Sequence, residues 1–209
     1  MKKVMLILAF FALHCSFFTS AAAQGRFDAA ISAGLTMGQI DGDGAGRYNH
    51  PGLRAGVGTS FTLGSDTESP WRMVVEVAFA QKGSVVNTGY DQRNITLNYV
   101  ELPLMISYNF MDSRARVAFG LAPAVLAGAS VSDDGVENQP LADTYRRLDL
   151  LPLVVSVRYR FADHLCLEGR YENSMLSISD RQGSGTYRIF RDNKGTFSRL
   201  LTIGLAWQL

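Results

Sequence analysis

Charged side chains stand at every second position along several otherwise uncharged segments of the chain. Around residues 158–160 and 168–172, arginines and glutamates alternate with Tyr159, Gly169 and Tyr171. Because successive side chains of a β-strand point to opposite faces, this spacing puts the charges on one face of each strand. Such a face can form ion pairs or line a water-filled channel. The residues predicted to share it are Asp28, Arg54, Arg72, Glu76, Lys82, Glu101, Arg158, Arg160, Glu168, Arg170 and Glu172.

Both signs of charge are present in near balance, which favours a self-neutralising network that fills a narrow interior. A hairpin turn at residues 162–164 would place Arg158 directly opposite Glu168, so we predict an ion pair between them. Arg170 is expected to join that network beside Glu168 or Glu172. Leaving one such buried charge without a partner would cost about 3–5 kcal/mol. The alternative is that these charges line a narrow solute channel.

Residue types that carry catalysis or bind metals are scarce. Beyond residue 23 the histidines are His50 and His164, and neither comes with a placed serine nucleophile. The segment 41–44 resembles the start of a calcium loop, but the glutamate required at its twelfth position is replaced by Gly52. Cys166 stands alone, without a second cysteine for a disulfide or a metal site. We therefore expect no enzyme activity, cofactor or metal; a lipid-modifying enzyme with His50 at its rim is the third functional alternative.

The N-terminus has the pattern of a secretion signal. Lys2 and Lys3 precede an apolar stretch at residues 4–18, and alanines at 21–23 form a small-residue cleavage site. The apolar stretch is shorter than the roughly 20 residues that a membrane-spanning helix needs. We expect residues 1–23 to be removed and residues 24–209 to form one domain. The net charge of +1 and the lack of a basic block argue against a nucleic-acid partner.

Eight later segments show the period of two that a strand with one apolar and one polar face requires. We predict strands at residues 27–37, 51–63, 71–82, 94–110, 115–130, 148–161, 165–179 and 196–209. Most reach the roughly 9–11 residues that a tilted strand needs to cross a bilayer. The connections at 38–50, 83–93, 131–147 and 180–195 are long, and those at 64–70, 111–114 and 162–164 are short. Short periplasmic turns and long extracellular loops are typical of bacterial outer-membrane barrels.

Aromatic side chains gather at the short-turn end of the apolar face, where a girdle at the membrane interface would lie. They are Phe27, Phe61, Trp71, Tyr108, Phe110, Phe119, Tyr159, Phe161 and Trp207. The other face is rich in small residues, as the narrow interior of an eight-stranded barrel requires. A soluble lipocalin-like barrel, with the apolar face inside, is the alternative.

The pattern predicts an all-β fold, a single closed up-and-down antiparallel transmembrane β-barrel of eight strands in the bacterial outer membrane. Its first strand must pair with its last, because no backbone edge can remain unpaired in lipid. Pro103, Pro123 and Pro152 fall inside strands, where proline cannot donate to the ladder, so we expect bulges there.

Several strand motifs resemble those of the PorT-like outer-membrane β-barrel domain family. They are EVAFAQKG at residues 76–83, YVELPL at 99–104, LEGRY at 167–171 and IGLAW at 203–207. The resemblance extends over essentially all of residues 24–209. It implies an outer-membrane location, and some members of that family are associated with protein secretion or gliding machinery. It carries no catalytic signature.

Arginines interleaved with aromatic residues in the last two long loops form the candidate contact surface: Tyr145, Arg146, Arg147, Arg181, Tyr187, Arg188, Phe190, Arg191 and Lys194. Arginine binds phosphate bidentately and aromatics supply contact area, which suits lipopolysaccharide phosphates or an envelope protein partner. Anchoring of the barrel rim to anionic head groups is the alternative. We expect a monomer, embedded in outer-membrane lipid, with a structural or interaction role in envelope integrity, adhesion or an envelope complex.

Overall fold

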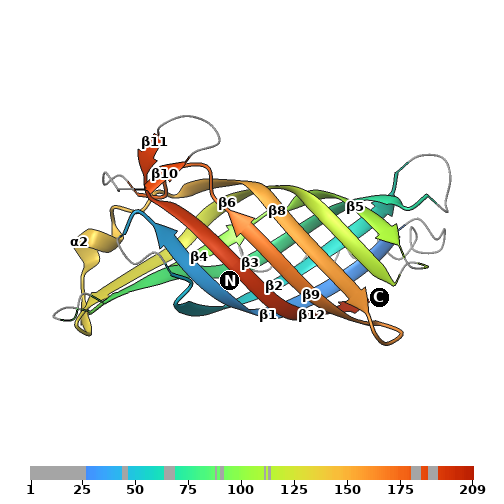
Figure 1. The fold of residues 1–209 in the computed structure, drawn as a ribbon, viewed down its shortest axis with the longest axis horizontal. Coiled ribbons are helices and arrows are strands. Elements are labelled where there is room, and N and C mark those ends of the chain that lie inside the picture. The colour runs from blue at the N-terminus through green and yellow to red at the C-terminus, as the bar shows by residue number, and fades with distance from the viewer. Residues whose placement is uncertain are drawn as a thin grey trace, which may run out of the picture.

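Eight antiparallel strands form the body of the protein (Figure 1). The computed structural model describes residues 27–43, 47–63, 69–87, 89, 92–110, 112, 114–179, 185–187 and 193–209. The strands are β1 (Phe27–Asp41), β2 (His50–Thr62), β3 (Trp71–Asn87), β4 (Gln92–Glu101) continued by β5 (Leu104–Phe110), β6 (Ala115–Asp133), β8 (Leu148–Arg160), β9 (Leu165–Asn173) and β12 (Phe197–Gln208). Each pairs with its neighbours along the chain, as the period-two pattern predicted.

The ring closes between its first and last strands. β1 pairs antiparallel with β12, with Ile31 opposite Trp207 and Gly34 opposite Gly204. The two backbones approach closely here, since a Cβ added to Gly204 would lie 2.4 Å from the carbonyl oxygen of Ala33. The protein is therefore a closed up-and-down β-barrel, and the predicted pairing of the first and last strands is confirmed.

The two ends of the barrel differ (Figure 1). The short connections and the C-terminus lie at one end, and small elements stand on the other. These are β7 (Val136–Glu137), α2 (Gln139–Ala142), β10 (Gly185–Tyr187) and β11 (Asn193–Gly195). Helix α2 begins after Asn138, whose Oδ1 accepts a 3.1 Å hydrogen bond from the Leu141 amide. Two of the predicted long loops therefore contain secondary structure of their own.

Strand lengths depart from the prediction mainly at the long-loop end. β1, β3 and β6 each extend several residues beyond their predicted ends. The extra residues of β1 pair with β12, and those of β3 and β6 pair with β4. β9 ends at Asn173 and not at residue 179. The chain leaves the sheet there, and Ile178 turns inward and is fully buried. The apolar pattern of 174–179 thus reflects packing over the barrel opening.

Prolines interrupt the ladder where the sequence predicted. Pro103 divides the fourth strand into β4 and β5, and its carbonyl accepts a 3.0 Å hydrogen bond from the Glu76 amide. The register between β6 and β8 shifts between Gly120 and Ala122, next to Pro123 and opposite the segment that contains Pro152. A further shift follows Asn98 in the β4–β6 pairing. Each shift reverses the inward face of the strand that carries the extra residue, which is β8 in the first case and β6 in the second, since the side-chain period is two.

The outer face of the barrel is apolar and the lumen is mixed. Outward side chains such as Ile31, Leu35 and Ile203 are among the most exposed in the chain. Trp71 and Tyr108 pack edge to face, with ring centroids 4.9 Å apart, near the short turns. Phe197 has the same strand parity as the outward Ile203, yet it is buried at the long-loop end, where a Cβ added to Gly195 would lie 3.1 Å from its ring. No helix in the described part of the chain is long and apolar enough to cross a membrane.

Candidate functional site: the barrel interior and its two mouths

A network of charges around Glu76 and Arg170 occupies the middle of the lumen. Arg170 Nη2 lies 2.6 Å from Glu76 Oε2 and 2.8 Å from Glu168 Oε1. On β2, Arg54 Nη1 reaches Glu76 Oε1 at 2.9 Å. Three strands separate β3 from β9 in either direction around the ring, so the Arg170–Glu76 pair crosses the lumen. These charge-assisted hydrogen bonds join opposite walls of the barrel.

Two neighbouring pairs extend this network. Arg158 stands opposite Glu168 in the β8–β9 register, and its Nε lies 2.8 Å from Glu168 Oε2. This confirms the pair predicted from the hairpin. Glu172 Oε1 lies 3.6 Å from Arg54 Nε and 3.7 Å from Arg170 Nη1. Arg170 therefore contacts both glutamates that the sequence offered as its partners.

A second buried pair lies nearer the long-loop end. Lys82 Nζ on β3 is 2.6 Å from Glu101 Oε1 on β4, and both side chains are buried almost completely. The Lys82 ammonium also lies over the ring of Tyr99, 5.0 Å from its centroid. Asp149 is buried as well. The lysine is thus held by a carboxylate and a ring away from bulk water.

The short-turn mouth is rich in arginine. Asp28 Oδ2 on β1 accepts from Arg72 Nη2 at 2.9 Å and lies 3.5 Å from Arg116 Nη2. Arg116 Nε also donates to Asn109 Oδ1 at 2.8 Å. β1 and β6 stand on opposite sides of the ring, so Arg116 and Asp28 form a second link across the lumen.

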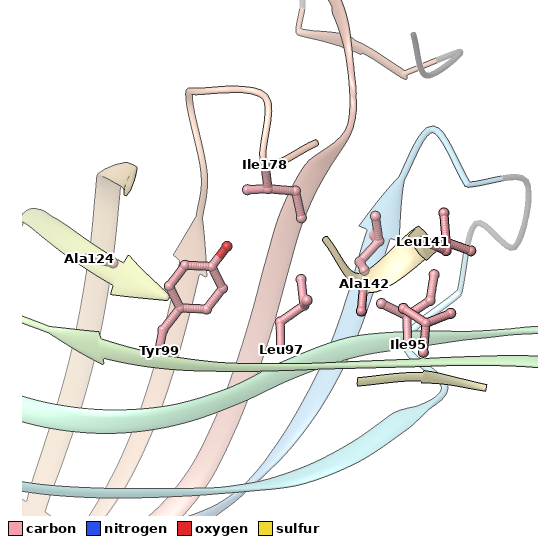
Figure 2. Close-up of a cluster of buried hydrophobic side chains, with 9 residues drawn as sticks. Ile95, Leu97, Tyr99, Ala124, Leu141, Ala142 and Ile178 are labelled. Atoms are coloured by element: carbon pink, nitrogen blue, oxygen red, sulfur yellow. The ribbon is translucent and has the colours of Figure 1, made fainter. Parts of the chain in front are cut away.

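Apolar side chains close the long-loop end (Figure 2). Ile95, Leu97 and Tyr99 project from β4 toward Leu141 of helix α2 and toward Ile178. All are buried, and with Ile40, Ala124, Val131 and Ala142 they form one cluster, which we call the apolar cap. A separate apolar cluster from β3, β5, β6 and β8 comprises Val74, Met105, Ala118, Ala122, Leu151 and Val154. The interior is therefore packed by ion pairs in its middle and by apolar groups above and beside them.

The cavities near the short-turn mouth are small. One of about 10 Å³ lies beside Asp28 and Glu76, and one of about 20 Å³ lies beside Arg116 and Arg158. A cavity needs roughly 10–15 Å³ to hold one water. Each therefore has room for about one water molecule, which matches an interior filled by side chains.

Comparison with known proteins agrees with this architecture. The family model for the outer membrane protein beta-barrel domain matches residues 20–180 of the chain. The chain belongs to this family. No curated protein sequence matches it. The crystal structure of Ail, the attachment invasion locus protein of Yersinia pestis, is similar, with 12% identity and a TM-score of 0.50. The match covers 88% of this chain and 99% of Ail.

Neisserial surface protein A gives a match of the same extent. Its crystal structure has 12% identity and a TM-score of 0.48, covering 88% of this chain and 96% of that protein. At such low identity, the Ail match supports the fold alone. The family assignment implies a bacterial outer-membrane location, and the broader family that the sequence motifs suggested is confirmed.

In this outer-membrane barrel, the predicted charged residues largely meet. Ten of the eleven take part in the ion pairs described above, and Arg160 lines the 20 Å³ cavity beside Arg158. The sequence prediction missed Arg116 and Asp149. Arg116 alternates with Ala118 and Gly120, so strand parity alone could have found it. Asp149 could not be found in this way, because the shift next to Pro123 reverses the inward face of β8.

The loop residues predicted as a contact surface are only partly assembled. Arg146 and Arg147 are exposed, and Tyr145 is half-buried and packs against the apolar cap. Tyr187 and Lys194 lie on the β10–β11 hairpin. Arg181, Arg188, Phe190 and Arg191 fall outside the residues that the structure describes, as does the predicted signal segment at 1–23.

Each of the two histidines in the described part of the chain has a neutral hydrogen-bond partner. His50 is buried beside Gly83, and its Nε2 lies 2.9 Å from Thr96 Oγ1. His164 lies in an exposed turn, where Nδ1 contacts the Gln208 carbonyl at 2.8 Å and the ring stacks on Trp207. Among the described residues, no group of three or more His, Cys, Asp or Glu side chains is placed to hold a metal ion.

Proposed function

We propose that this protein is a non-catalytic, non-conducting scaffold of the outer membrane that acts through its extracellular end. The observation that carries the proposal is the hydrogen bond between Arg170 and Glu76, which spans the middle of the lumen. The apolar cap lies above it, toward the long-loop end, and we expect a lumen filled in this way to block ions. A rigid, filled barrel is suited to holding loops and short elements at the cell surface.

Electrical recording tests the closed lumen. The full chain, folded in detergent and inserted into a planar bilayer, is expected to give no steady conductance. A gel band that shifts on boiling, checked in parallel, shows that the inserted protein is folded. Steady single-channel steps from the folded wild type would contradict the proposal and favour the narrow solute channel.

The proposed working surface is the long-loop rim around helix α2 and the β10–β11 hairpin. Arg146 and Arg147 are exposed there, and the connecting sequence supplies further arginines and aromatics. Guanidinium groups bind phosphate through paired hydrogen bonds. We infer that this rim contacts lipopolysaccharide phosphates, or an acidic envelope protein, and that the barrel acts as a monomer.

A lipopolysaccharide-binding assay tests this surface. With the barrel in phosphatidylcholine nanodiscs, R146Q/R147Q is expected to bind purified lipopolysaccharide at least several-fold more weakly than the wild type. The matched control is R93Q/R199Q, which removes the same charge from the same rim. Those two arginines already bind Asp133 and Asp41, each at 2.5 Å. Equal binding by all three proteins would overturn the assignment of the rim to lipopolysaccharide.

Three finer assignments belong to the same proposal. Export with removal of residues 1–23 predicts that the mature protein begins at Gln24, which intact-mass measurement of the membrane-inserted protein decides. Kinship with PorT-like members predicts a place in an envelope complex, which crosslinking at the rim would capture.

The absence of catalysis predicts that lipid substrates keep their mass during incubation. Cleavage that is lost in His50→Ala would replace the scaffold with the enzyme alternative.

A further inference from the structure

Four arginines face one another across two adjacent strands at the short-turn mouth. Arg116 on β6 stands directly opposite Arg158 on β8. One step closer to the turns, the Arg160 amide donates a 2.7 Å hydrogen bond to the Arg114 carbonyl, so these two residues are also opposite one another. Like charges placed directly opposite on paired strands destabilise a sheet. This arrangement therefore favours an anion that lies between the guanidinium groups.

The side chains of these four arginines line a single cavity. Its volume is about 20 Å³, and its other walls are Cys166, Ala206 and Gln208. Within the part of the chain that the structure describes, no carboxylate lines this cavity. Arg114 is exposed and Arg160 is half-exposed, so the outer pair of arginines reaches solvent. The cavity is thus a positively charged recess that opens at the barrel mouth.

Two acids of the lumen that contact this group, Asp28 and Glu168, are each shared with a further arginine. Asp28 Oδ2 accepts from Arg72 at 2.9 Å as well as lying 3.5 Å from Arg116. Glu168 binds Arg158 through one oxygen and the fully buried Arg170 through the other, each at 2.8 Å. These two carboxylates are therefore shared with the lumen network and are not held by the four mouth arginines alone.

We propose that the short-turn mouth is a binding site for a phosphate group, held by Arg114, Arg116, Arg158 and Arg160. Guanidinium groups match phosphate oxygens with paired hydrogen bonds. The recess has room for about one water molecule, so the phosphate lies at its opening, between the exposed ends of Arg114 and Arg160. This mouth faces the periplasm if the short turns do, as in other bacterial outer-membrane barrels. The phosphate can then come from a phospholipid head group of the inner leaflet or from free phosphate.

Titration with inorganic phosphate tests whether the four arginines bind a phosphate group. The full folded chain in phosphatidylcholine nanodiscs is titrated by calorimetry, with chloride at equal ionic strength as the blank. The wild type is expected to bind phosphate, and R114Q/R160Q to bind at least tenfold more weakly. R93Q/R199Q, with the same charge change at the opposite rim, is expected to bind as the wild type does, because these two arginines pair with Asp133 and Asp41 there. Equal binding by all three proteins, or no binding by the wild type, would overturn the proposal.

A second experiment distinguishes a phospholipid head group from free phosphate as the bound species. Nanodiscs that contain phosphatidylglycerol are analysed by native mass spectrometry for retained lipid. Retention by the wild type that is lost in R114Q/R160Q, and that is reduced by added phosphate, supports a lipid head group at this site. Phosphate binding without lipid retention supports the free ion.

Folding of the variants is checked independently of binding. Both double variants must give the folded gel band that shifts on boiling. Arg114→Gln alone, at the most exposed of the four positions, provides a milder change and is expected to weaken phosphate binding at least threefold. Unchanged phosphate binding in a folded R114Q/R160Q protein contradicts the proposal.

Discussion

Arg170 and Glu76 are 94 residues apart in the chain, yet Arg170 Nη2 donates a 2.6 Å hydrogen bond to Glu76 Oε2 across the lumen. Both side chains are almost fully buried. Glu76 is also the partner of Arg54 and lies 4.0 Å from Arg158. One carboxylate from β3 therefore contacts arginines from three other strands.

Glu76→Gln is expected to destabilise the folded barrel by about 3–5 kcal/mol, because it leaves buried guanidinium groups without their carboxylate. Urea unfolding in lipid vesicles, followed by tryptophan fluorescence, measures the change. The matched control is Glu137→Gln on the exposed strand β7, which should shift the midpoint little. Similar unfolding curves for the two variants would show that the cross-lumen network contributes nothing to stability.

We expect Lys82 and Glu101 to be strongly coupled in their contributions to the free energy of unfolding. Lys82→Met alone leaves a buried carboxylate unpaired and should cost about 3–5 kcal/mol, and Glu101→Gln alone should cost a similar amount. The double variant K82M/E101Q should be more stable than the sum of the two costs predicts, because neither charge remains. A double-mutant cycle from urea midpoints gives the coupling energy. Strict additivity would mean that the pair seen at 2.6 Å is not energetically formed.

Two glycines of β6 should respond differently to the same substitution. A Cβ at Gly120 would lie 2.0 Å from the Leu104 carbonyl oxygen, whereas one at Gly128 would meet nothing closer than 3.9 Å. Gly120→Ala is therefore expected to destabilise the barrel by about 1–3 kcal/mol through overpacking against backbone. Gly128→Ala should have a much smaller effect. The comparison needs only the two urea curves, and equal shifts would argue against the close approach of β5 and β6.

Asp133 lies at the long-loop end of β6, and we expect its carboxyl group to have a lowered pKa. Hydrogen bonds from Arg93 Nε and Asn138 Nδ2 hold the pKa of this carboxyl below its ordinary value. A carboxyl with a lowered folded-state pKa stabilises the fold above its ordinary pKa, and this contribution is lost as pH falls through the lowered value. Carboxyl carbon NMR should show the low pKa, and Arg93→Gln should raise it. Arg199→Gln, at the same rim, should leave it unchanged.

Local sequence pattern was sufficient for contacts within a hairpin. The turn at 162–164 sets the register of its two strands, so the Arg158–Glu168 pair followed from counting residues. The same counting failed at Asp149, because the register shift next to Pro123 reverses the inward face. It failed at Ile178 too, because that apolar residue covers the barrel opening and does not continue a strand.

Period-two alternation, connection lengths and the aromatic girdle determined the eight strands, their order and their orientation, because each of these depends only on neighbours in the chain. Ring closure decided everything that crosses the lumen. It placed Glu76 against Arg170 and Asp28 against Arg116, whereas the register between β6 and β8, with its shift, placed Arg116 opposite Arg158. These contacts join strands that the sequence does not place side by side, or residues whose register a bulge resets. Only the closed barrel could reveal ion pairs at the centre of the lumen beneath an apolar cap, and four arginines that line one cavity at the other end.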